Sequence, residues 1–268
     1  MRRTYWIAIF WSAVCLGVAG KTAKNQAIVM SDPQAIAFAV QATANLTGDN
    51  VVSDATLSVS VTSIAGSETL TGTGTMYAKG TLESRVDLSL NGTTTSTIRN
   101  LTGLFPQGET IAQDGTVQPA AMHNCWLSPS WFSPVSSFLT ATTDPTLIFS
   151  YVGQETRGTR SVQHLRAYRN FNSPNPHFVA ITQAVSTADF YLDAATLLPV
   201  AITFNGHPDD DAGTNIPMEV DILAYQSVNG VQMPLHIQQL ISDGLALDVV
   251  VNSVALNSGL SDSLFAIQ

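Results

Sequence analysis

Residues 188–204 of the chain read ADFYLDAATLLPVAITF, and they place one aspartate between two apolar runs. Apolar and polar residues alternate up to Asp193, which favours a strand with one buried face. Asp193 then occupies the first position of a turn, where its carboxylate can accept hydrogen bonds from backbone N–H groups a few residues on. Pro199 fits the beginning of a returning strand, because no ladder donor is needed there. The stretch therefore predicts a β-hairpin in which Asp193 fixes the register and has no catalytic role.

The sequence on both sides of this hairpin continues the strand pattern. Asn229-Gly230 and Asp243-Gly244 are dipeptides typical of tight hairpin turns, because such residues tolerate positive φ. Each lies between runs of alternating apolar and polar residues, so an antiparallel arrangement is expected. The strands predicted around the first hairpin span residues 146–158, 161–170, 177–185, 218–230, 231–244 and 245–257.

Residues 54–100 have the same period of two. Asn91-Gly92 is a third hairpin signal. Gly72 and Gly74 share one face of their strand, where glycine usually marks strong curvature or the close approach of another backbone. Long adjacent hairpins with a glycine-bent strand indicate a sheet that curls toward a barrel. The apolar residues that alternate along these strands are Leu57, Val59, Val61, Val86, Leu88 and Leu90.

A helix of three to four turns is expected before the first strand. Ser31 or Asp32 can cap its beginning, and Pro33 occupies the first helical position, where proline is favoured. Gly48 is expected to end it. The apolar residues at helical spacing, which should face the core, are Ile36, Val40 and Ala44.

The first 20 residues have the layout of an export signal. Arg2 and Arg3 form a short basic head, and an uncharged apolar run extends from Trp6 to about Ala19. This run is shorter than the ~20 residues that span a bilayer. The domains expected are a cleaved signal peptide, residues 1–20, and one half-barrel domain, residues 21–268. The mature protein is expected to be exported to the periplasm.

The two cysteines have different expected fates. Cys15 lies inside the signal and lacks the residue pattern of a lipidation site, so anchoring through it, or through an uncleaved signal, is not expected. Only Cys125 remains in the mature chain, so no intrachain disulfide can form. We interpret Cys125 as a small buried hydrophobe.

The mature chain is acidic. All 20 acidic residues lie beyond residue 20, together with nine of the 11 basic ones, which gives a net charge of about −11 with histidine neutral. This charge argues against binding nucleic acid and against docking on anionic membranes. Charged residues make up 12% of the chain and apolar residues 45%, a composition typical of a well-buried protein and not of a disordered one.

The alternation stops between residues 103 and 145, where Trp, Phe, Ser and Pro predict short helices or turns. One interpretation is a helical plug packed into the core. The other is a mobile apolar lid over the open side of the sheet, lining a pocket for an acyl chain. The candidate lipid-binding residues are Trp126, Trp131, Phe132, Phe138, Leu57, Val59, Val86 and Leu88.

The usual catalytic motifs are absent from the sequence: it contains no nucleophile elbow, phosphate-binding glycine loop, dinucleotide fingerprint or paired-histidine metal helix. The loop from His207 to Asp211 is the best metal candidate, because oxygen ligands there could hold calcium. It lacks the alternating acidic spacing and distal glutamate of a calcium loop, so an exposed acidic turn is predicted. No catalytic residue, metal or cofactor is expected.

Three segments of the C-terminal third together resemble the LolA-like superfamily of outer-membrane lipoprotein carriers. They are ADFYLDAATLLPVAITF, EVDILAYQSVNGVQMPLHIQQ and LDVVVNSVALNSGLSDSLFAI. The shared features are a strand ending in aspartate with a proline after the turn, a strand entering NGVQMP, and a last strand closing on Asn257 before DSLF. The resemblance is most specific in residues 188–268. The sequence departs from the dedicated carriers in its aromatic insertion and lacks a clear match to their lid-holding basic residue, for which Arg99 is the candidate.

The resemblance implies a mainly β (α+β) protein. Its curved antiparallel sheet forms an open half-barrel, with an N-terminal helix and a helical lid or insertion. It further implies that the concave apolar face binds lipid or acylated protein, in lipoprotein or lipid transport, without a cofactor. A regulatory or protein-interaction module of the cell envelope (RseB-type sensing), with an envelope protein as transient partner, is the alternative. An unrecognised hydrolase is the third. We expect a monomer that is not an enzyme.

Overall fold

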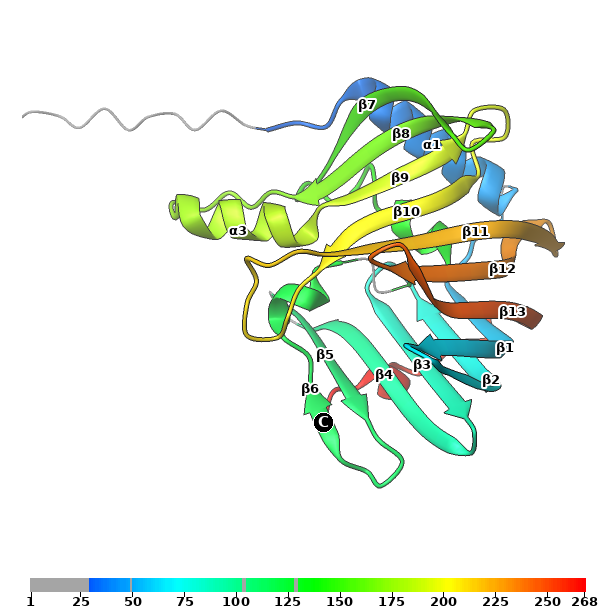
Figure 1. Ribbon diagram of the computed structural model, residues 1–268. Coiled ribbons are helices and arrows are strands. Elements are labelled where there is room, and N and C mark those ends of the chain that lie inside the picture. The colour runs from blue at the N-terminus through cyan, green and yellow to red at the C-terminus, as the bar shows by residue number, and fades with distance from the viewer. Residues whose placement is uncertain (1–28, 49, 103–104, 128–129) are drawn as a thin grey trace, which may run out of the picture.

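The computed structural model describes residues 29–48, 50–102, 105–127 and 130–268, so the predicted signal peptide and Cys15 lie outside the described residues. Its strands form one curved, unclosed antiparallel sheet in the order β6-β5-β4-β3-β2-β1-β13-β12-β11-β10-β9-β8-β7 (Figure 1). The expected mainly β half-barrel is confirmed. The strands are β1 (Asp54–Ala65), β2 (Glu68–Lys79), β3 (Glu83–Leu90), β4 (Thr93–Thr102), β5 (Phe105–Ile111), β6 (Val117–Pro119), β7 (Leu147–Arg157), β8 (Arg160–Arg169), β9 (Ala188–Asp193), β10 (Pro199–Gly206), β11 (Ile216–Val228), β12 (Val231–Ile241) and β13 (Gly244–Leu256).

Helices cover the inside and one end of this sheet. Helix α1 contacts β7, β12 and α2, whereas α3 connects β8 to β9 and lies at the left in Figure 1. Within the described ranges, no helix has both the length and the apolar character needed to cross a membrane. The helices are α1 (Pro33–Thr47), α2 (Pro134–Phe138) and α3 (Pro176–Ser186), with the short 3-10 helices η1 (Met122–Cys125) and η2 (Asp262–Phe265).

The core lies between the concave face of the sheet and helices α1 and α2. Strand register places Leu165, Phe190, Ile202 and Val220 in one row across β8, β9, β10 and β11. All four side chains are buried in the same apolar cluster. Because neighbouring strands present these residues on one face, the row forms a continuous apolar wall.

Helix α1 begins and ends as predicted, but its most buried face is the one next to the predicted face. Asp32 accepts a hydrogen bond from the Gln34 N–H, and Gly48 ends the helix in the left-handed conformation. Of the expected inward residues, Ile36 is partly buried and packs against the core. Val40 is 47% exposed and Ala44 is also exposed, so the prediction is wrong for these two. The chain has two apolar stripes here, and the alanine-rich one allows the helix to approach the sheet more closely. The fully buried residues of α1 are Ala35, Ala39, Ala42 and Leu46.

Of the three turns predicted from Asn-Gly and Asp-Gly dipeptides, two are confirmed. Asn91-Gly92 and Asn229-Gly230 have φ values of 47° and 84°, and of 51° and 87°, as tight hairpin turns require. The third turn is Ser242-Asp243, one residue earlier than predicted, because Gly244 already pairs with Ile241. Gly72 confirms the expected close approach: a β-carbon there would lie 1.8 Å from the carbonyl oxygen of Ser89.

Two segments differ from the sequence prediction. Residues 105–111 and 117–119 form strands β5 and β6, where only short helices or turns were expected. Residues 177–185, predicted as a strand, belong to helix α3. The Asn175 side chain caps this helix by accepting from the N–H groups of His177 and Phe178, and Pro176 is its first residue. The β-branched residues Val179, Ile181 and Val185 favour a strand. The Asn175-Pro176 start favours a helix instead, and the helix buries one face, formed by Val179, Thr182, Val185 and Ser186.

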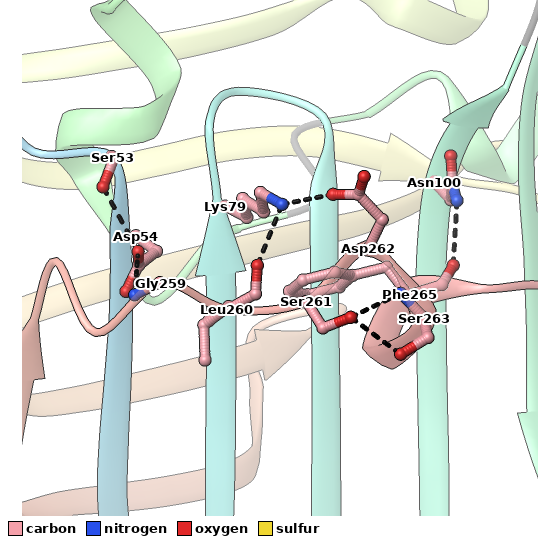
Figure 2. A network of polar contacts seen from close by, with 10 residues as sticks. All are labelled: Ser53, Asp54, Lys79, Asn100, Gly259, Leu260, Ser261, Asp262, Ser263 and Phe265. Carbon is pink, nitrogen blue, oxygen red and sulfur yellow. Dashed lines mark hydrogen bonds and ion pairs between the residues drawn. The ribbon is translucent and has the colours of Figure 1, made fainter.

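The segment after β13 crosses the outer face of β1 to β4 (Figure 2). Asp54 accepts hydrogen bonds from the backbone of Ser258 and Gly259, at 2.7 and 3.0 Å. Further along, Lys79 pairs with Asp262, and the Asn100 side chain donates to the carbonyl of Phe265. The DSLF motif of the resemblance is therefore a tail held against the outside of the half-barrel.

Candidate functional site

A cavity lies on the inner side of the sheet, between two walls that are distant in the sequence. One wall comes from the β2–β3 turn, β4 and β5. The other comes from β7, the end of β8 and the start of β9, and η1, α2 and the segments beside them fill the space between. The lining residues are Thr81, Leu82, Arg99, Asn100, Leu101, Pro106, Cys125, Trp126, Leu127, Ser136, Ser137, Thr140, Leu147, Phe149, Ala167, Arg169, Ser186, Ala188 and Phe190.

This cavity is small. It holds about 80 Å³, although the whole depression, counted out to open solvent, reaches about 760 Å³. Pockets that bury a drug-sized ligand usually measure roughly 300–1,000 Å³. The cavity is therefore too small for a long ligand, which needs a shift of the helices that fill the half-barrel.

The aromatic residues of the insertion divide between the cavity and the core. Trp126 lines the cavity, and Trp131 lines a neighbouring cavity together with Val86. Phe132 and Phe138 are buried in the core, where the Phe138 ring packs 5.0 Å from that of Phe190. The insertion thus contains both a plug and a cavity wall.

The apolar strand residues proposed for lipid binding lie deeper than the cavity. Leu57 and Val59 are fully buried on β1, in the same apolar cluster as α1 and α2. Leu88 is partly buried and packs against that cluster. These three residues pack behind the side chains that line the cavity. Only a larger opening of the half-barrel would expose them to a ligand.

Phe105, Phe171 and Phe178 form an aromatic group around Trp126 that the sequence prediction missed. The ring of Trp126 lies 5.4 Å from that of Phe171 and 6.4 Å from that of Phe105, and Phe178 contacts both phenylalanines. Phe105 is 42% exposed, so this group forms an apolar rim beside the cavity. The sequence gives no sign of this group, because it predicts turns at residues 105–111 and a strand at residues 177–185, where the structure has β5 and α3.

Two arginines line the cavity, and their surroundings differ. Arg169 donates to Asp144 at 2.8 Å and to the Thr146 hydroxyl at 2.9 Å. Burial alone would raise the pKa of Asp144, but hydrogen bonds from Thr146 and Arg169 hold it below its ordinary value. Arg99, the candidate for a lid-holding residue, lies on β4 and lines both the main and the neighbouring cavity.

Cys125 is buried in the cavity wall, as predicted. Burial raises the pKa of its thiol, outweighing the opposite influence of Arg99. The thiol donates to the carbonyl oxygen of Ala121 at 3.4 Å. A protonated thiol is a poor nucleophile, so we assign Cys125 a role in packing the cavity wall.

The loop from His207 to Asp211 is tied to η1 and is organised by hydrogen bonds. The Asn124 side chain and the backbone of His207 exchange two hydrogen bonds, at 2.8 and 3.0 Å. Asp211 accepts from the Gly213 N–H and the Thr214 hydroxyl. The three aspartates are exposed, as predicted, but His207 is buried. Across the described ranges, no three His, Cys, Asp or Glu side chains are grouped so as to hold a metal ion.

Asp193 begins the turn between β9 and β10, and its carboxylate accepts hydrogen bonds from the backbone of that turn. Its Oδ1 accepts from the N–H groups of Ala195 and Thr196, at 3.0 and 2.9 Å, and from the Thr196 hydroxyl. The predicted hairpin and the structural role of this aspartate are therefore confirmed.

These features define an open antiparallel half-barrel, plugged by helices and with a small apolar cavity inside. No protein-family model matches the sequence, and no curated protein matches it. Solved structures do match the fold. A domain named for outer membrane lipoprotein sorting, from Vibrio parahaemolyticus, has a TM-score of 0.56 at 12% identity, over 87% of this chain and 96% of its own.

Two further structures have the same architecture. A DUF1329 family protein from Desulfovibrio piger has a TM-score of 0.57 at 12% identity, over 89% of this chain and 98% of its own. A LolA superfamily protein from Nitrosomonas europaea has a TM-score of 0.52 at 10% identity, over 87% of this chain and 97% of its own. The chain therefore has the LolA-like fold, and the resemblance found in residues 188–268 is confirmed at the level of fold.

Proposed function

We propose that the chain is an exported, periplasmic protein of the cell envelope that binds lipid or acylated protein on the concave face of its half-barrel, in lipid or lipoprotein transport. The observation that carries this proposal is the cavity, whose inner wall presents Leu147, Phe149 and Phe190. An apolar chain gains about 0.8 kcal/mol for each buried CH₂ group, so a wall of this kind favours an acyl chain.

Helix α2 is the element that must move to admit such a chain. It has only five residues, and Ser133 at its beginning makes no side-chain cap. A helix this short depends on packing for its stability, so an acyl chain that replaces its apolar contacts can displace it. Val135 and Phe138 occupy the inner side of the half-barrel that the ligand would take.

The cavity is suited to binding and not to catalysis. The thiol of Cys125 is kept protonated by burial, and Arg169 is held by Asp144. We therefore assign the protein to the binding proteins and not to the enzymes. Its candidate ligand contacts are Trp126 and Trp131, with Phe132, Phe138, Leu57, Val59, Val86 and Leu88 behind the plug.

Lipid analysis of the purified protein tests the proposal. The mature chain is isolated from an envelope extract under mild conditions, and bound lipids are measured by mass spectrometry. Uptake of a fluorescent fatty acid by the delipidated protein is measured in parallel. Co-purified acyl lipid and saturable uptake are expected. A protein that carries no lipid and takes up no fatty acid would show that the half-barrel has another use.

The small cavity volume of about 80 Å³ favours a second candidate function. A half-barrel already filled by α1 and α2 can instead present its surface to an envelope protein, as a regulatory or interaction module. Affinity capture from the same extract separates the two functions. One stable protein partner without lipid would favour the module, whereas lipid without a stable partner would favour the carrier.

A further inference from the structure

The cavity has an unusual charge for this protein. Although acidic residues outnumber basic ones in the chain, none of the described residues that line the cavity is acidic. Its two charged side chains are Arg99 and Arg169. Arg169 is neutralised by Asp144 at 2.8 Å, so Arg99 supplies the net charge.

The guanidinium of Arg99 is fixed in position without an acidic partner. Its Nη1 donates to the carbonyl oxygen of Ile98 at 3.1 Å, and no carboxylate of the described residues lies within 4.0 Å of it. The side chain lies across Gly108 of β5, where an added β-carbon would meet Nη1 at 2.5 Å and Cδ at 2.7 Å. The glycine thus provides the space that directs Arg99 along the cavity wall.

The wall opposite Arg99 is mainly apolar. Apart from Arg169, whose charge is neutralised by Asp144, it presents Leu147, Phe149, Ala188 and Phe190, from β7 and β9. A partly buried arginine without a carboxylate partner binds carboxylate and phosphate groups well, because its planar fork can donate two parallel hydrogen bonds. A cation on one wall and an apolar surface on the other match a molecule with an anionic head and a hydrocarbon tail.

We propose that the cavity selects amphiphiles with an anionic head, either a carboxylate or a phosphate, which Arg99 binds while the chain lies against β7 and β9. This inference rests on the proposed lipid-binding function and names its ligand class. The acyl chains of an acylated protein are attached through uncharged ester or amide groups. An anionic preference therefore points to free lipid as the ligand and away from acylated protein.

Three ligands with the same 12-carbon chain and different heads test the proposal: dodecanoate, dodecyl phosphate and dodecanol. Each is titrated below its micelle concentration into the delipidated mature protein at pH 8, with calorimetry and tryptophan fluorescence as readouts. Both tryptophans of the mature chain, Trp126 and Trp131, line the cavities and should report binding. At least one anionic ligand should bind about tenfold more tightly than dodecanol, and the preferred head identifies carboxylate or phosphate as the natural group.

Variants of the arginine and its surroundings locate the effect. Arg99→Gln should reduce the affinity for the anions about tenfold and leave dodecanol binding unchanged. Arg99→Lys should keep part of the preference. Gly108→Ala keeps the charge but displaces the guanidinium, so it should also weaken the preference several-fold. Arg160→Gln, which removes an exposed arginine at the beginning of β8, is the matched control and should change neither affinity.

The possible failures are distinguishable. If dodecanol binds the wild-type protein as tightly as the anions, or if Arg99→Gln keeps the preference, the head-group inference is wrong and lipid binding stands. If none of the three ligands binds, the proposed function itself is wrong. Thermal unfolding of each variant shows whether it is folded, and Arg99→Lys and Gly108→Ala keep the test decisive if Arg99→Gln fails to fold.

Discussion

The carboxylate of Asp193 acts on the backbone of the turn that follows it. Burial alone would raise its pKa, but the hydrogen bonds from Thr196 and Ala195 hold the pKa of Asp193 below its ordinary value. A lowered pKa means that this carboxylate stabilises the fold above its unfolded pKa, and that the stabilisation is lost as pH falls through the folded pKa. This turn then sets the register between β9 and β10.

We predict that Asp193→Asn has little effect, because asparagine retains the Oδ1 acceptor. The free energy of unfolding should fall by less than about 1 kcal/mol for Asp193→Asn and by about 1–2 kcal/mol for Asp193→Ala, which removes the acceptor. Urea denaturation measures both changes. Fatty-acid uptake should be unchanged in both variants. Loss of uptake in a folded Asp193→Asn protein would contradict the structural role.

Asp221, on the outer face of β11, has a pKa that is raised, whereas that of Asp193 is lowered. Burial, a hydrogen bond that protonated Asp221 donates to Glu219, and the negative charge of Glu219 raise the pKa of Asp221 to about 6, although Arg157 opposes the rise. Arg157 is itself paired with Glu219 and stacks 4.1 Å from the ring centre of Tyr191. Two neighbouring carboxylates thus share one arginine.

We predict that the protein loses stability as pH rises from about 4 to 7, because in this range the folded state binds more protons at Asp221 than the unfolded state does. Asp221→Asn should flatten this dependence and raise the free energy of unfolding at pH 7 by about 1 kcal/mol, a value reduced for solvent screening at a half-exposed site. Denaturation curves from pH 4 to pH 8 measure the effect. Asp210→Asn, in the exposed loop, controls for the loss of one charge, and an unchanged slope in Asp221→Asn would exclude this origin.

At the scale of elements, helix α2 plugs the half-barrel. Its Phe138 ring lies 6.2 Å from that of Phe149 and 5.0 Å from that of Phe190, and both of these phenylalanines line the cavity. The plug and the cavity wall therefore share an aromatic contact, and removing one ring would enlarge the cavity.

We predict that Phe138→Ala has opposite effects on stability and uptake. Removing a buried phenylalanine should lower the free energy of unfolding by about 3–5 kcal/mol, while the new space raises uptake of the fluorescent fatty acid. Phe265→Ala is the matched control, because Phe265 is fully buried against β3 and β4 on the outer face. It should cost comparable stability without a gain in uptake. Equal uptake by the two variants would show that α2 does not limit access.

The elements that the sequence predicts best are those whose local signals agree. Residues 188–193 form β9 as expected, because alternation, turn aspartate and proline all favour a hairpin. Helix α3 was missed because its β-branched residues favour a strand, and only the Asn175 cap and Pro176 indicate otherwise. The face of α1 could not be chosen either, since two apolar stripes compete and the sheet accepts the alanine-rich one.

The candidate site was harder to predict than the fold. Trp126 was found from composition, but its neighbours Phe105, Phe171 and Phe178 come from three separate segments. The contrast between Arg99 and Arg169 depends on which of them lies beside Asp144, and no local pattern contains that information. A cavity between distant walls becomes visible only when strand order is known.

At the scale of the whole molecule, the tail after β13 is bound to the outer face through Asp54. Burial alone would raise the pKa of Asp54, but hydrogen bonds from Ser258, Gly259 and Ser53 keep it below its ordinary value. Figure 2 shows the bonds from Gly259 and Ser53. At pH values above the unfolded pKa of Asp54, the charged carboxylate holds the tail in place. This contribution to stability is lost as pH falls through the folded pKa of Asp54.

We predict that Asp54→Ala releases the tail without opening the sheet. The free energy of unfolding should fall by about 1–3 kcal/mol, because the N–H groups of Ser258 and Gly259 lose their acceptor. Hydrogen exchange measured by mass spectrometry should accelerate in residues 258–268 and remain slow in β1 and β13. Equal acceleration in β1 would show that the tail and the sheet open together.

The pairing of β1 with β13 has a consequence for the order of events in folding. Leu57 pairs with Val254, so the contact that joins the two halves closes a loop of roughly 200 residues. The hairpins on either side can form early, but the central seam must wait until β13 has been synthesised. Such late closure delays native folding, which would suit the proposed export of the chain across a membrane before it folds. Until that moment β1 keeps an open edge, and this edge is where a chaperone would protect the chain from aggregation.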